Sequence, residues 1–335
     1  MSLEGKFITA ERAYGRYEKS IVKDLTRNYQ IALKEIRGDI ALAFEKYGGE
    51  YQEMVKYNRL ANLEKDVSDE IRKLTGKNAL TLKQGTAGAF EDSFYRVGFT
   101  LETEAQAKLR FGMLNPKTIE AAVTNPLDRV GFLQRNRENQ ARLTRQLRDN
   151  LTQGLIRGES YQQVARRIKE RMDVGATNTM RIAQTEMHRC HVEGRLAGFQ
   201  QAEKAGVELD YIWSATVDGR TRDMHADMDG RKADVTMDGR PYFALPDGLT
   251  VEGPGLTGIP EHDINCRCAV RAEIAGYSPE LRRVRMADED YEEAVAAEQR
   301  AAEQEGRDPR KVSRSTIENY QTYHRWYNAR ILKVA

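Results

Sequence analysis

The 335-residue chain contains little cysteine, proline or tryptophan and no long apolar segment. Its three cysteines, eight prolines and two tryptophans exclude a disulfide scaffold, so we expect free thiols or metal ligands. The mean hydropathy of -0.70, together with the lack of an apolar run of about 18 residues, excludes a membrane span. The first twenty residues lack the apolar stretch of a secretory signal. We therefore expect a protein of a cytosol-like compartment.

The chain also lacks an excess of one charge. Its 53 basic and 51 acidic residues give a formal net charge of +2, which alone does not predict nucleic-acid binding. Residues 129–171, however, contain eleven arginines and lysines against four acidic residues. The arginines that we expect to face DNA or an acidic protein surface are Arg135, Arg142, Arg145, Arg148, Arg157, Arg166, Arg167 and Arg171. Aromatic residues are sparse there, so base stacking has little support and a solvated helix face is the alternative.

Helical periodicity dominates the first 205 residues. Apolar side chains that recur every three or four positions predict helices at 14–47, 57–74, 80–98, 143–155, 161–172 and 177–204. We expect Gly48-Gly49 and Gly76 to end helices, and Ser160 to cap the start of one. The pattern predicts an elongated helical N-terminal region, residues 1–128, and further helices over 130–204.

The pattern changes at residue 208. Residues 208–275 contain Asp-Gly pairs, prolines and short alternating runs, which are typical of strands and turns. Leu209–Trp213 and Cys268–Ala272 are predicted to be strands of a short β-sheet. We therefore expect an α+β fold in which residues 208–275 form a second, β-containing domain.

Residues 276–335 are predicted to form a charged linker and a helical C-terminal tail. The stretch 286–305 is strongly acidic. The tail carries apolar side chains at helical spacing, namely Tyr320, Tyr323, Trp326, Tyr327 and Ile331. Such a helix docks on its own domain or binds a partner, and the sequence leaves both interpretations open.

Histidine and cysteine residues in the β-containing part suggest a metal site. Cys266 and Cys268 are two residues apart, so on a strand they project to one face. His225 and His262 can complete a tetrahedral set of nitrogen and sulfur ligands, which predicts a structural zinc ion. The alternative is that the thiols are buried as small hydrophobes while the histidines bond to backbone carbonyls.

The acidic residues around His225 allow a third interpretation. Asp218, Asp223, Asp227 and Asp229 would suit a metal-dependent nuclease or hydrolase that activates water. No residue is marked as the general base, and an aspartate before glycine, such as Asp229, is typical of turns. Phosphate-binding loops and dinucleotide motifs are absent.

A second polar group precedes the β-containing part. Glu186 and Arg189 are three residues apart on a predicted helix and can pair. We expect a set of side chains to orient the β-containing part through charge-assisted hydrogen bonds, namely Thr185, Glu186, Arg189, Asp218, Arg220 and Arg222. An exposed helical ion pair is the alternative.

The order of four motifs resembles the phage Mu F-like minor head proteins, also called the phage head morphogenesis family. The motifs are Leu151-Thr-Gln-Gly-Leu-Ile-Arg-Gly-Glu-Ser-Tyr161, Ile182-Ala-Gln-Thr-Glu186 with Arg189, Asp218-Gly-Arg-Thr-Arg222 with His225, and His262 with Asn265-Cys-Arg-Cys268. The resemblance covers roughly residues 130–275 and implies that residues 129–275 form the family domain, made of the helices over 130–204 and the β-containing part. Some relatives have cysteine at the position of His225, an exchange that fits metal ligation. Asp263 departs from the family pattern, which has proline there.

The resemblance implies a minor capsid protein of a tailed phage or prophage. Such a protein is made in the bacterial host cytoplasm and lies inside the head near the portal vertex, where it aids head assembly and DNA packaging or delivery. The implied partners are the portal protein, the major capsid or scaffold protein and packaged double-stranded DNA. The core family domain implies no enzymatic activity. A nuclease or hydrolase acting on phage or host DNA, and a cellular adaptor with a zinc module, are the alternatives.

Overall fold

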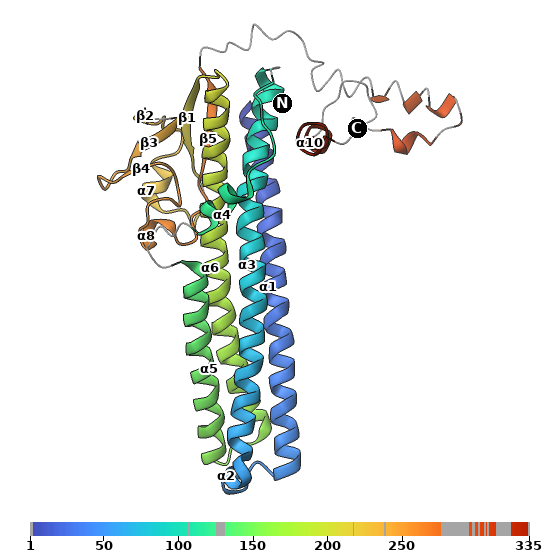
Figure 1. The fold of residues 1–335 in the computed structure, drawn as a ribbon, viewed down its shortest axis with the longest axis vertical. Helices are drawn as coiled ribbons and strands as arrows, with labels where there is room; N and C mark the ends of the chain where they lie inside the picture. The colour runs from blue at the N-terminus through green and yellow to red at the C-terminus, as the bar shows by residue number, and fades with distance from the viewer. Residues whose placement is uncertain are drawn as a thin grey trace.

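Four long antiparallel helices form the body of the molecule (Figure 1). They are α1 (Leu3–Tyr47), α3 (Arg59–Ala105), α5 (Phe132–Ile156) and α6 (Tyr161–Lys204). The computed structural model describes residues 3–105, 108–124, 131–216, 218–237, 239–275 and 323–333, with the short pieces 295–296, 299–300, 302–304, 306 and 308–312. At about 1.5 Å per residue, α1, α3 and α6 each span about 65 to 70 Å, whereas α5 spans about 38 Å. The elongated helical region predicted from the sequence is confirmed.

The helices pack through apolar stripes whose spacing places every third or fourth side chain on one face. Ile36 and Ile40 of α1, Ile71 of α3 and Leu147 and Leu151 of α5 are fully buried in one cluster. Shorter helical pieces connect or flank the bundle, namely α2 (Tyr51–Val55), the 3-10 helix η1 (Lys56–Asn58) and α4 (Pro116–Thr124). No described helix is long and apolar enough to cross a membrane.

Two predicted helix breaks are wrong. Helix α3 continues through Gly76, and α6 continues through the gap between the predicted helices 161–172 and 177–204. Gly76 is exposed, and its cost of about 1 kcal/mol in a helix interior is outweighed by packing on either side, where Ile71 and Leu82 are fully buried. The predicted stop at Gly48-Gly49 is confirmed, since both residues adopt φ of +72° and α1 ends at Tyr47.

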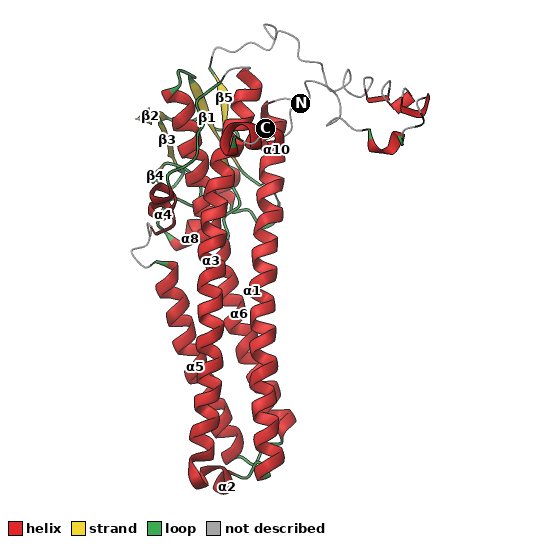
Figure 2. Cartoon of the chain, turned by 45° about the vertical axis from the view of Figure 1, so that its right-hand side comes forward, coloured by secondary structure: helices red, strands yellow, loops and turns green. Residues whose placement is uncertain are grey.

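Among the described residues, five short strands form two sheets beside the part of the bundle that α5 does not cover, and they gather at one end of the molecule (Figure 2). Strand β1 (Leu209–Ser214) pairs antiparallel with β5 (Ala269–Ile274), so that Ser214 faces Ala269. The second sheet has the order β2-β3-β4, with β2 (Val235–Met237), β3 (Arg240–Ala244) and β4 (Thr250–Val251). The one-turn helices are α7 (Asp223–Ala226) and α8 (Pro260–Asp263). The predicted α+β class is confirmed.

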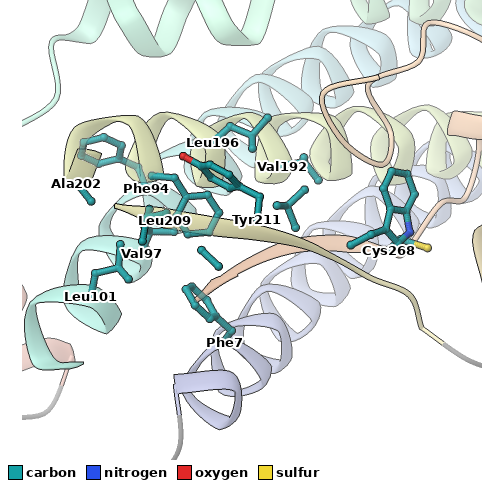
Figure 3. Packing of buried hydrophobic residues seen from close by; sticks show 14 of the residues in the cluster. Phe7, Phe94, Val97, Leu101, Val192, Leu196, Ala202, Leu209, Tyr211 and Cys268 are labelled. Carbon is teal, nitrogen blue, oxygen red and sulfur yellow. The ribbon is translucent and has the colours of Figure 1, made fainter. Parts of the chain in front are cut away.

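The β-containing part shares its core with the bundle. Phe199 of α6 packs edge-to-face on Tyr211 of β1, with ring centroids 5.5 Å apart. Trp213 of β1 packs in the same way on Phe243 of β3 at 5.4 Å. Cys268 belongs to this cluster and lies at one end of it (Figure 3).

The C-terminal tail docks on the bundle. Helix α10 (Tyr323–Tyr327) continues as the π-helix η5 (Asn328–Leu332). Trp326 is 1% exposed, and its Nε1 donates to Glu102 of α3 at 2.6 Å. Most of the predicted linker, including the bulk of the acidic stretch, and Tyr320 lie outside the described residues, apart from short pieces such as the 3-10 helix η3 (Pro309–Lys311).

Candidate metal centre

Helix α7 and the segment just before β5 bring one histidine and two cysteines together. The Nδ1 atom of His225 lies 3.6 Å from the Sγ atoms of both Cys266 and Cys268. The candidate ligand atoms of the three residues all lie within 4.8 Å of one another. The three residues are 2%, 5% and 2% exposed. Two segments about 40 positions apart along the chain therefore converge on one buried point.

The spacing of these atoms fits a tetrahedral zinc ion. Zinc bonds of about 2.05 Å to nitrogen and about 2.3 Å to sulfur, at the tetrahedral angle, place the two ligand atoms about 3.6 Å apart. The separations from His225 to Cys266 and Cys268 match this value, and neither cysteine forms a disulfide. His225 Nδ1 thus faces thiols and not a backbone carbonyl. The arrangement is a possible His/Cys/Cys metal site.

The two thiols differ in ionisation. A hydrogen bond from Cys266 and a second from His225 lower the pKa of Cys268, against the opposing effect of burial. The same thiol–thiol contact, together with burial, raises the pKa of Cys266. Thiolate is the form of cysteine that binds metal, and the contact between the two thiols favours the ionisation of one of them.

His262, the fourth predicted ligand, lies beside this group and is not among the atoms within 4.8 Å. Its ring stacks on that of His225, with centroids 5.7 Å apart and an interplanar angle of 18°. Its Nε2 lies 3.0 Å from an oxygen of Asp247. A neutral imidazole that donates from Nε2 has a lone pair at Nδ1, and this Nδ1 is buried with no hydrogen-bond partner among the described residues. Its ligation stays a prediction.

A polar framework holds the two ligand segments together. Arg267, which lies between the cysteines, donates to both oxygens of Asp218 at 2.7 and 2.6 Å. Arg222, just before α7, donates to the carbonyl of Ile264 at 2.6 Å. The hydroxyl of Thr216 donates to the carbonyl of Arg267 at 2.9 Å. The hydrogen bonds from Arg267 hold the pKa of Asp218 well below its usual range.

The loop that follows β4 is closed by Asp263, the residue that departs from the family pattern. Its carboxylate accepts from the backbone N–H of Thr257 at 3.2 Å and of Gly258 at 2.8 Å. It also accepts from the hydroxyl of Thr257 at 2.9 Å. These bonds, together with Pro260 at the first position of α8, fix the start of α8 and hence the position of His262.

The predicted orienting residues fall into two separate groups. Asp218 and Arg222 act within the framework just described, whereas Arg220 is exposed and lies 3.8 Å from Asp218. Arg189 donates to Glu186 at 3.0 Å and to the carbonyls of Ala122 and Val123 at the end of α4.

Glu186 also pairs with Arg135 of α5. The hydroxyl of Thr185 is buried without a partner among the described residues. The contacts of Glu186 and Arg189 thus join helices α4, α5 and α6, and an orienting role for the β-containing part stays a prediction.

The eight arginines predicted to face DNA or the portal also fall into two groups, those near an acidic side chain and those that form no ion pair. Arg148 pairs with Glu64 at 2.9 Å, and Arg167 pairs with Glu159 at 2.7 Å. Arg135 is held by Glu186, and Arg157 lies 3.9 Å from Glu159. The remaining four are exposed and form no ion pair with a described residue, namely Arg142, Arg145, Arg166 and Arg171. They lie on α5 and on the early part of α6, away from the strands (Figure 1).

Two residues next to the site could not be predicted from the sequence. Asp247 resembled an ordinary turn residue before glycine, and its contact with His262 depends on the fold of the loop. His188 of α6 is 4% exposed and packs against Gly255, where a Cβ would lie 2.6 Å from its ring. Burial, reinforced by His191 and His225, lowers the pKa of His188 to about 3.

Comparison with known proteins identifies the class. The model of the family described as Phage Mu protein F like protein matches residues 145–271, which include the whole His/Cys/Cys group. A relative from Bacillus phage SPP1, named minor head protein GP7, is 32% identical over 271 residues, covering 79% of this chain and 86% of the relative. The chain belongs to the phage Mu F-like family of minor head proteins.

Two further relatives come from bacteria. An Enterococcus faecalis protein named NAD(+)–arginine ADP-ribosyltransferase EFV is 30% identical over 221 residues, covering 65% of this chain and 44% of that protein. An uncharacterized Haemophilus influenzae protein is 30% identical over 118 residues, covering 35% of this chain and 22% of that protein. No solved structure gives a significant match. The comparisons give no support to the nuclease alternative.

Proposed function

We propose that this chain is a structural minor head protein, a virion component that works in head morphogenesis and has no enzymatic activity of its own. The observation that carries this proposal is the similarity to minor head protein GP7 over 79% of the chain. Residues 129–275 form the family domain in this account. The protein lies inside the head near the portal vertex and aids DNA packaging or delivery.

The long bundle suits contact with large partners. Its helices reach about 65 Å, so one end can lie on the portal protein while the other reaches the major capsid or scaffold protein. The four arginines without ion pairs, Arg142, Arg145, Arg166 and Arg171, give the half of the bundle away from the strands a positive surface. We propose that this surface meets packaged DNA or an acidic patch of the portal.

A titration separates DNA from protein as the target of these arginines. The variant with all four arginines replaced by glutamine is compared with a control that replaces Lys34 and Lys65, exposed lysines of α1 and α3. DNA contact predicts binding to duplex DNA that weakens steeply between about 50 and 200 mM salt and is lost in the arginine variant alone. If duplex binding is absent at low salt but portal binding is lost in that variant, the portal is the target.

We propose that the metal site is a structural zinc site with His225, Cys266 and Cys268 as ligands and His262 as the fourth. The match of the N–S distances to zinc geometry supports this, and so does the buried Nδ1 of His262 that has no described partner. A catalytic zinc keeps an open position for water, whereas these side chains are all at most 5% exposed. When bound, zinc supplies a rigid cross-link between the two segments.

The absence of catalysis is tested with two assays, one for ADP-ribose transfer and one for DNA cleavage. The purified full-length chain is incubated with NAD+ and an arginine-containing acceptor, and separately with DNA and several divalent metals. We expect neither ADP-ribose transfer nor cleavage. Cleavage that disappears in folded His225→Ala, or transfer of ADP-ribose, would replace the structural role with an enzymatic one.

A further inference from the structure

A cavity of about 410 Å³ lies between α1, α3 and the C-terminal helix α10, away from the metal site. This volume is in the range that holds small ligands or a side chain of a partner. Its walls carry four tyrosines and two carboxylates, namely Tyr17, Tyr95, Tyr323, Tyr327, Glu91 and Asp92. The combination of aromatic rings and carboxylates is the subject of the inference.

One of the two carboxylates, that of Asp92, already has a counter-charge. Asp92 accepts from the Nε of Arg96 at 2.5 Å and from the hydroxyl of Tyr323 at 3.3 Å. The guanidinium of Arg96 also lies over the ring of Tyr323, 4.3 Å from its centroid. The guanidinium of Arg96, which lines the cavity, therefore already has Asp92 and Tyr323 as partners.

The second carboxylate, that of Glu91, has no such partner. It is half-buried and forms no hydrogen bond or ion pair with a described residue. Burial, and then the negative charge of Asp92, raise its pKa. A partly desolvated carboxylate without a counter-charge is costly, so the cavity has a place for one more cation.

The tyrosine rings give the cavity an apolar and electron-rich lining. Tyr327 packs edge-to-face on Tyr95 at 5.2 Å. The hydroxyl of Tyr95 accepts from the backbone N–H of Leu114 at 2.7 Å, and that of Tyr17 donates to the carbonyl of Gln84 at 3.1 Å. These bonds point the hydroxyls at the backbone and hold the rings in place. Ring faces attract cations, and aliphatic stems pack on them.

We propose that this cavity binds an organic cation, a primary ammonium or guanidinium group on an aliphatic stem. The charged group pairs with Glu91, and the stem lies on the rings of Tyr17, Tyr95 and Tyr327. Such a group comes from a free alkylamine or from a lysine or arginine side chain of a protein partner. In either case the ligand lies under α10 and ties the C-terminal helix to α1 and α3.

Calorimetric titration of the full-length protein tests this. The probes are 1,5-diaminopentane, N-acetyl-lysine amide acetylated at Nα so that its side-chain ammonium is free, and, as a neutral analogue, 1,5-pentanediol. We expect saturable binding of the amines and none of the diol. The variant Glu91→Gln, which keeps the shape and removes the charge, should weaken amine binding about tenfold, which corresponds to about 1.4 kcal/mol. The control Glu45→Gln, at an exposed site of α1, should leave binding unchanged.

A second variant, checked for folding, keeps the proposal testable if Glu91→Gln does not fold. Tyr327→Leu removes an aromatic wall and should weaken binding while circular dichroism still shows the helical bundle. Tighter binding of N-acetyl-lysine amide than of the diamine supports a protein side chain as the natural ligand, and the reverse order supports a soluble amine. Equal binding of the diol, an unchanged affinity in Glu91→Gln, or no saturation by about 10 mM amine would overturn the proposal.

Discussion

Arg267 donates two hydrogen bonds to the carboxylate of Asp218, at 2.7 and 2.6 Å, and so fastens the cysteine segment to the loop that leads to His225. Paired bonds between a guanidinium and a carboxylate fix geometry as well as adding energy. The loop and the segment can then present their ligands at a constant separation. The positions of the candidate ligands thus depend on a pair that ligates nothing itself.

We predict that Asp218→Asn weakens zinc binding about tenfold, because residues that orient ligands typically contribute factors of about 10 to 100 in affinity. Competition with a chromophoric chelator measures this. The matched control is Arg220→Gln, since the Arg220 side chain is 81% exposed and lies 3.8 Å from Asp218. Equal affinities of Asp218→Asn and the wild type would show that the framework does not position the site.

We predict that the purified protein contains about one equivalent of zinc and that chelation unfolds the β-containing part while most helical signal remains. Elemental analysis and circular dichroism measure the two effects. Cys268→Ser should lose the metal, whereas Cys190→Ala should keep it, because Cys190 is buried on α6 beside the carbonyl of Ala122. Less than about a tenth of an equivalent of zinc in the wild type would show that the protein has no structural zinc site.

We predict opposite effects for two Gly→Ala substitutions in the bundle. At Gly194 of α6 a Cβ would lie 2.2 Å from the carbonyl oxygen of Phe90, so Gly194→Ala must push α3 and α6 apart and should lower the free energy of unfolding by about 3 kcal/mol. Gly76 has no heavy atom within 4 Å of the same position, so Gly76→Ala should raise that free energy by up to about 1 kcal/mol. Urea denaturation compares the two, and equal effects would contradict this packing.

We predict an acid-dependent loss of stability that depends on His188. Its folded pKa of about 3 lies below the usual 6.5, so below pH 6.5 the unfolded chain binds a proton that the folded chain does not. Stability should therefore fall by up to about 1.4 kcal/mol per pH unit between about pH 6.5 and 3, with no contribution above pH 6.5.

Comparing the slope of the free energy of unfolding against pH in the wild type and in His188→Leu isolates this effect. Any change in stability that the substitution causes at every pH does not alter the slope. Identical slopes below pH 6.5 would mean that His188 is protonated in the folded protein.

The sequence predicted the helical bundle because its apolar spacing reports directly which face of each helix is buried. It failed at Gly76, because a local helix breaker does not reveal the tertiary packing that keeps the helix intact. Leu209–Trp213 was predicted correctly as a strand, while the second predicted strand starts one residue later, at Ala269.

Of the candidate site, the convergence of His225 with the cysteines followed from ligand chemistry and from the family resemblance. The contact of Asp247 with His262 and the cavity around Glu91 could not be predicted from either. Both depend on loops and helices that meet only in the folded chain, and neither leaves a spacing pattern in the sequence.

The position of this chain in an assembled particle tests the central claim most directly. An asymmetric cryo-electron microscopy reconstruction of heads from the phage that encodes it, with the chain labelled by an inserted tag, gives that position. The account predicts rod-shaped density about 65 Å long inside the head, next to the portal vertex. Heads that lack the chain, or density on the outer shell or the tail, would contradict it.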